Sequence, residues 1–136
     1  MLALLKELGP KLELRAGAET SAIAEAQKAL AWTFPEVHVV FLRTSNSAVG
    51  MLASGDCVDL WPVEQLSELN SSYQFPEYYL EVVAFGSGGG GEAFVFRRSN
   101  AHIAIVPFIG MAIDEAVDIA PAFTGFLRRP RPAGWE

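Results

Sequence analysis

The central part of the chain carries carboxylates that have no basic residue close by in the sequence. No Lys or Arg occurs between Arg43 and Arg97, and this segment holds seven acidic residues. They are Asp56, Asp59, Glu64, Glu68, Glu77, Glu81 and Glu92. One interpretation is a solvated acidic surface, which favours solubility. The other is a surface that attracts a basic partner and speeds the encounter with it.

Aromatic residues lie among these carboxylates, and a further acidic pair follows later in the chain. Aromatic faces and carboxylates together suit the capture of Arg or Lys side chains, through cation–π contacts and charge-assisted hydrogen bonds. Trp61 is either such an exposed aromatic residue or a core anchor where a strand meets a helix. The predicted partner-binding set is Asp56, Asp59, Trp61, Glu64, Glu68, Glu77, Tyr78, Glu92, Asp114 and Glu115.

Few residues of the chain suit catalysis. His38 and His102 are the only histidines, and His38 lies among apolar residues, which favours a place in the core. Cys57 has no local base, so we expect it to behave as a small apolar residue. No Cys or His spacing resembles a zinc site. We therefore predict no enzyme activity, no metal and no cofactor, with a hydrolase that uses carboxylate pairs as the weaker alternative.

A run of glycines separates two apolar segments. Residues 86–91 read Gly-Ser-Gly-Gly-Gly-Gly, between strand-like residues 79–85 and 92–96. Glycine adopts positive φ without steric cost, so the run predicts a sharp turn between two strands and backbone open to close approach. The sequence that follows argues against a phosphate-binding loop, because it contains no Lys-Ser or Lys-Thr and predicts a strand rather than a helix.

Length and composition predict one globular domain. The chain has 136 residues, of which 51% are hydrophobic, so it can bury a substantial core. The net charge of −6 argues against nucleic acid as a direct partner. No apolar run is long enough to span a membrane, and residues 1–7 are too short and too soon charged for a signal peptide. The single Cys57 cannot form an internal disulfide, so we expect a reduced, cytoplasmic setting.

Helix signals cluster early in the chain and strand signals later. Proline, glycine and apolar spacing predict helices over residues 2–8, 20–30, 35–43, 62–72 and 121–127, although residues 39–42 alone also suit a strand. Strands are predicted over residues 49–53, 57–61, 79–85, 92–96 and 101–108. This order favours an α+β fold over regular βαβ alternation. We expect one domain over residues 1–127, followed by a mobile, basic and Pro-rich tail over residues 128–136.

Five short motifs occur in an order that resembles the SMI1/KNR4 (SUKH) family. The Leu-Trp-Pro-Val-Glu-Gln-Leu segment resembles the strand-to-helix element of that family, and the glycine run resembles its hairpin. The opening helix pair, last strand and closing helix have counterparts here as well. The matching segments are residues 23–43, 60–66, 85–94, 106–111 and 119–127.

The resemblance implies an α+β domain with a twisted, mostly antiparallel sheet and helices packed against it. It also implies a binding role without catalysis. Many bacterial members of the family are immunity proteins that neutralise toxins, often nucleases, and others have housekeeping, regulatory or scaffold roles. Combined with the acidic segment, this favours a protein partner that is a basic toxin domain.

Overall fold

The helices and strands of the computed structural model follow the predicted order closely. The structure describes residues 1–52, 55, 57–72, 81–88, 91–108 and 116–128. The helices are α1 (Leu2–Leu8), α2 (Thr20–Leu30), α3 (Glu36–Thr44), α4 (Val63–Ser72) and α6 (Phe123–Arg128). The strands are β1 (Glu13–Leu14), β2 (Ala48–Met51), β3 (Cys57–Leu60), β4 (Val82–Ser87), β5 (Glu92–Arg97), β6 (Ile103–Pro107) and β7 (Val117–Ala120).

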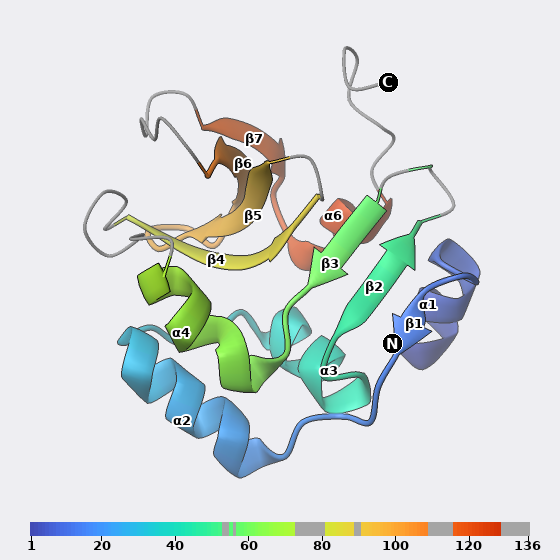
Figure 1. Ribbon diagram of the computed structural model, residues 1–136, viewed down its shortest axis with the longest axis horizontal. Coiled ribbons are helices and arrows are strands. Elements are labelled where there is room, and N and C mark those ends of the chain that lie inside the picture. Colours follow the sequence, from blue (N-terminus) through green and yellow to red (C-terminus); the bar gives the residue numbers. More distant parts are fainter. Residues whose placement is uncertain (53–54, 56, 73–80, 89–90, 109–115, 129–136) are drawn as a thin grey trace.

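The strands form one sheet in which each strand pairs antiparallel with its neighbour in the sequence. The order β1-β2-β3-β4-β5-β6-β7 gives a seven-stranded sheet. Figure 1 shows β1–β3 and β4–β7 as two parts that run in different directions, with α2, α3 and α4 beside them. The predicted α+β fold with an antiparallel sheet and packed helices is confirmed.

One glycine of the predicted run allows the two parts of the sheet to meet. Gly86 of β4 pairs with Leu60 of β3, and a Cβ atom on Gly86 would lie 2.7 Å from the Asp59 carbonyl oxygen. No larger residue fits there without moving the backbone of β3. The glycine run was expected to leave its backbone open to close approach. At Gly86 this approach is made within the fold, by the neighbouring strand β3.

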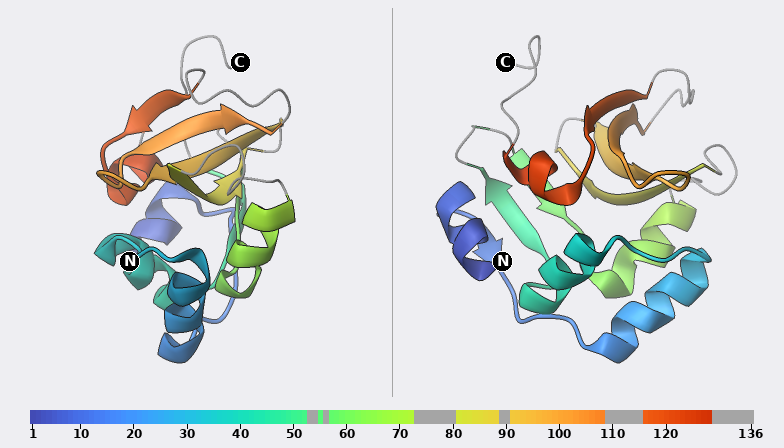
Figure 2. Two further views of the ribbon diagram at one scale, coloured as in Figure 1. Left: turned by 90° about the vertical axis from the view of Figure 1, so that its left-hand side faces the viewer. Right: turned by 180° about the vertical axis from the view of Figure 1, so that it is seen from behind.

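Phenylalanines from strands and helices fill the centre of the core. Phe85 and Phe96 stack with their ring centroids 4.3 Å apart, and Phe123 and Phe126 of α6 pack against Phe85. Phe41 joins them from α3. The helices α3 and α6 contact each other and lie toward the viewer when the molecule is seen from behind (Figure 2, right). These residues hold the sheet and the two helices together as one core.

His38 lies within this aromatic core. Its side chain is 2% exposed, and its ring centroid lies 5.1 Å from that of Phe96 and 5.3 Å from those of Phe34 and Phe123. Nδ1 has no hydrogen-bond partner among the residues that the structure describes. Burial away from water lowers the pKa of His38 to about 3, so the ring is neutral at physiological pH. The expected place of His38 in the core is confirmed.

Three details differ from the sequence predictions. Residues 39–42 belong to α3, so the strand alternative is wrong. Residues 11–19, where no helix or strand is predicted, contain the short strand β1, and β7 is likewise absent from the predicted strands. β7 has only four residues, and its buried and exposed positions do not alternate regularly. The sequence therefore shows no clear period of two there. The tail from residue 129 lies outside the described residues.

Candidate protein-binding surface

The structure describes half of the predicted partner-binding set. Asp59 lies on β3, Trp61 follows that strand, and Glu64 and Glu68 lie on α4. Glu92 begins β5. The remaining predicted residues lie outside the described residues; they are Asp56, Glu77, Tyr78, Asp114 and Glu115.

Asn46 fixes the first turn of α4. Its side-chain carbonyl accepts the Val63 N–H at 2.9 Å, which satisfies a donor at the helix N-terminus. Its Nδ2 lies 2.9 and 2.7 Å from the two carboxylate oxygens of Glu64. Glu64 therefore has a polar partner far away in the sequence, which its spacing from Glu68 did not reveal. Asn46 itself is buried, so this bond is held in place by the core.

The outer face of β1, β2 and β3 combines apolar and acidic side chains. Glu13 pairs with Val49, and Val49 pairs with Asp59, so the three side chains form a row across the strands on one face. In the next row Met51 pairs with Cys57. Val49 and Met51 are 41% and 48% exposed, on a face where polar side chains are the usual choice.

A shallow groove of about 380 Å³ runs over this outer face. It is lined by Val49, Gly50, Met51, Cys57, Val58, Asp59 and Gly88. Partial burial in the groove raises the pKa of the Asp59 carboxyl. Glu92 borders the same region, since a Cβ atom on Gly88 would lie 3.8 Å from Glu92 Oε2 and 3.9 Å from the Cys57 carbonyl oxygen.

Trp61 is buried and is not part of this surface. Its side chain is 6% exposed, and its ring stacks on Phe108 with centroids 6.4 Å apart. The Trp61 N–H donates to the Phe85 carbonyl at 3.0 Å, which ties the corner between β3 and α4 to β4. The prediction of a partly exposed aromatic residue is therefore wrong, and Trp61 is the core anchor of the alternative interpretation. Cys57, expected to behave as a small apolar residue, is exposed instead.

A second hollow lies between α2 and α4. It has a volume of about 240 Å³ and is lined by Ala22, Glu25, Ala26, Ala29, Val63, Glu64 and Ser67. Glu64 thus lies between this hollow and the Asn46 amide. The two helices pack through small residues, which leaves the carboxylates of Glu25 and Glu64 at the rim.

Among the described residues, one carboxylate of the sheet forms an ion pair. Arg97 Nε lies 2.7 Å from the Asp118 carboxylate, so this acidic residue has a basic partner across the sheet. Within the described ranges, Asp59, Glu68 and Glu92 form no ion pair. Their charges therefore remain available to a partner.

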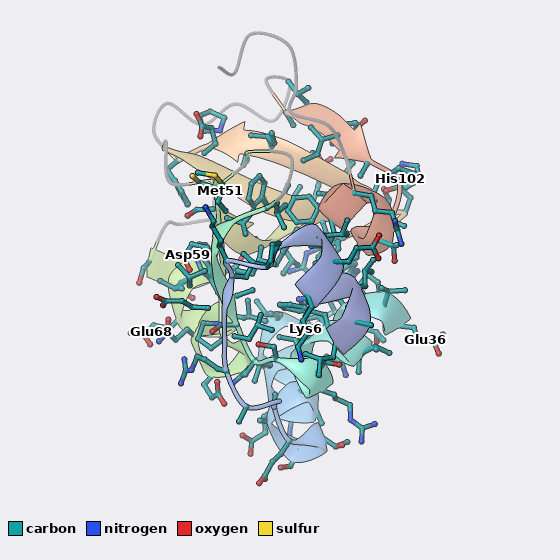
Figure 3. All side chains as sticks on the ribbon, turned by 90° about the vertical axis from the view of Figure 1, so that its right-hand side faces the viewer. Lys6, Glu36, Met51, Asp59, Glu68 and His102 are labelled. Carbon is teal, nitrogen blue, oxygen red and sulfur yellow. The ribbon has the colours of Figure 1, made fainter. Side chains whose placement is uncertain are left out.

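The unpaired carboxylates and the exposed apolar residues share one side of the molecule. Figure 3 shows Met51, Asp59 and Glu68 along one side, with Glu36 and His102 on the opposite side. We call the side formed by the outer face of β1–β3 and the exposed face of α4 the acidic face; its described residues are Glu13, Val49, Met51, Cys57, Asp59, Glu64 and Glu68. This combination of charged and exposed apolar side chains makes the acidic face a candidate surface for protein contact.

The described part of the chain includes side chains that could ligate a metal and both candidate catalytic residue types, histidine and cysteine. No group of three or more His, Cys, Asp or Glu in that part of the chain could hold a metal ion. His38 is buried in the core, and Cys57 lies exposed on the sheet face. No helix among the described residues has the length and hydropathy needed to cross a membrane.

The fold and the acidic face define a small α+β domain with an exposed sheet face suited to protein contact. A sequence profile of the SMI1 / KNR4 family (SUKH-1) matches residues 17–129. The chain therefore belongs to the SMI1/KNR4 (SUKH-1) family, and the predicted resemblance is confirmed. A search of curated proteins finds no significant match to the chain. Membership of this family is consistent with an immunity-like, protein-binding domain.

Proposed function

We propose that the protein is a non-enzymatic immunity protein that binds a basic, nuclease-type toxin in the cytoplasm and neutralises it. The observation that carries this proposal is the acidic face, where Asp59 and Glu68, which form no ion pair with any residue that the structure describes, lie on the same side as exposed Met51. Family membership adds support, since it is consistent with a protein-binding role.

The acidic face supplies the two contributions that a fast and stable complex needs. The carboxylates attract a positively charged toxin over a distance of about 8 Å at physiological ionic strength, which speeds encounter. The apolar side chains of Val49 and Met51 then lose contact with water, which slows dissociation. A nuclease carries basic residues to hold nucleic acid, so a protein bound at those residues excludes its substrate.

Co-expression with the toxin encoded beside its gene tests this proposal. We expect the protein to restore growth and to elute with the toxin as one complex from a sizing column. A toxin that is equally lethal with and without the protein, together with no complex on the column, would overturn the immunity role.

A further inference from the structure

The groove over β2 and β3 has an apolar floor with the Asp59 carboxylate at its edge, and Glu92 borders the same region. Val49 lies directly opposite Asp59, and Met51 lies directly opposite Cys57 in the neighbouring row. The four side chains point to the same face because paired residues of antiparallel strands do so. An exposed apolar patch of this kind on a sheet face is typical of an interaction site.

The Asp59 carboxylate has no partner within the described part of the chain. It forms no ion pair and accepts no side-chain hydrogen bond there. Lys11 lines a neighbouring hollow with Met51 and Leu52 and forms no ion pair with Asp59. Partial burial already disfavours the charged form of Asp59, so covering the groove with a neutral segment would leave a costly unpaired carboxylate.

These features indicate which chemical group can bind in the groove. We propose that the groove receives an arginine side chain of the partner, with its aliphatic stem on Val49 and Met51 and its guanidinium on Asp59. This assignment rests on the proposed function and names the group on the partner that the groove recognises. Charge complementarity requires a cation, and the apolar floor requires a hydrocarbon stem beside it.

Arginine fits these requirements better than lysine. Its planar guanidinium donates two parallel hydrogen bonds to one carboxylate, and it is less strongly hydrated than an ammonium group. Moving a guanidinium into a partly buried site therefore costs less free energy than moving an ammonium group there. The exposure of Asp59 leaves room for the guanidinium to reach both carboxylate oxygens.

Binding of n-butylguanidinium to the full chain, followed by NMR, tests this assignment. We expect saturable shifts confined to β2 and β3, weaker binding of n-butylammonium, and no localised shifts with n-butanol. The variant D59N should weaken binding about fivefold, as loss of an exposed ion pair does. V49T, which keeps the β-branched shape, should also weaken it, whereas E36Q on the opposite side should not.

Several outcomes would overturn the assignment. Equal binding to D59N and to the unmodified chain would exclude the carboxylate, and equal binding of n-butylammonium would exclude arginine selectivity. If n-butylguanidinium bound more tightly to an R129Q/R131Q variant, the chain's own arginines would compete with the probe, and the groove would be assigned to them. Toxin neutralisation that persists while the probe fails to bind would contradict the groove assignment alone and leave the proposed function intact.

Discussion

The amide of Asn46 bridges the first turn of α4, since it binds both carboxylate oxygens of Glu64 and accepts the Val63 N–H. Asn46 and Glu64 are 18 residues apart in the sequence. The bond joins the segment before β2 to the helix after β3. It therefore fixes α4 relative to the outer face of the sheet and holds the two parts of the acidic face together.

Replacing Asn46 tests this link. We expect N46A to lower the free energy of unfolding by about 2–3 kcal/mol, because it removes a charge-assisted hydrogen bond and leaves the Val63 N–H unpaired. Urea unfolding followed by circular dichroism measures the loss. E68Q, a change at an exposed position of the same helix, is the control and should stay within about 0.5 kcal/mol of the unmodified chain. Equal effects of N46A and E68Q would contradict the account.

Asn70 links α4 to β4 in the same way, at a position where the sequence predicted only a helix end. The residue is 2% exposed, its Nδ2 donates to the Leu66 and Ala84 carbonyls, and its Oδ1 accepts the Ala84 N–H at 2.9 Å. We expect N70A to destabilise the protein by about 3 kcal/mol, since buried backbone groups of β4 lose their partner. S71A, at the next and exposed position, is the matched control. Similar thermal unfolding of both variants would count against this role of Asn70.

His38 makes the stability depend on pH in a defined direction. Burial lowers the folded-state pKa to about 3 from an ordinary value of 6.5, so between these values the unfolded chain binds the additional proton. The contribution of His38 is therefore fully present above pH 6.5 and is lost as the pH falls, by up to about 1.4 kcal/mol per pH unit. We expect H38F, which fits an aromatic core, to lose this dependence. Unfolding free energies at pH 4, 5, 6 and 7 measure it, and parallel curves for the two proteins would contradict the assignment.

The sequence revealed much of the fold because local signals and tertiary packing agree. Pro35 and Pro62 mark where α3 and α4 begin, and the glycine run marks the turn between β4 and β5. The shortest strands were missed, because a strand of two or four residues is defined by its partner and not by its own period.

The candidate site could be predicted from the sequence only in part. Helical spacing places Glu64 and Glu68 on an exposed face, but Asn46, Val49 and Met51 carry no signal until the strands pair. The sequence also leaves the place of Trp61 open. A tryptophan between acidic residues suits an exposed position, but it suits the core equally when the corner around it is apolar. Whether a side chain faces solvent is decided by the register of the sheet, which the sequence alone does not give.

Electrostatic attraction by the acidic face predicts a salt-dependent association. Raising the ionic strength from about 0.01 M to about 0.15 M should slow association with the toxin about tenfold or more, with little change in dissociation. Stopped-flow kinetics measure both rates. The pair D59N/E68Q should flatten the dependence, whereas E7Q/E36Q, at exposed positions of α1 and α3, should preserve it. The same salt dependence in both variants would contradict attraction by this particular face.

Charge reversal in the co-expression assay tests the central claim most directly. D59K/E68K reverses two charges of the acidic face, and E7K/E36K changes the net charge by the same amount elsewhere, so overall charge is matched. With both variants folded by circular dichroism, the account predicts that D59K/E68K fails to protect cells from the toxin and that E7K/E36K protects them. Full protection by D59K/E68K would contradict the account, because the toxin would then bind without the carboxylates of the acidic face.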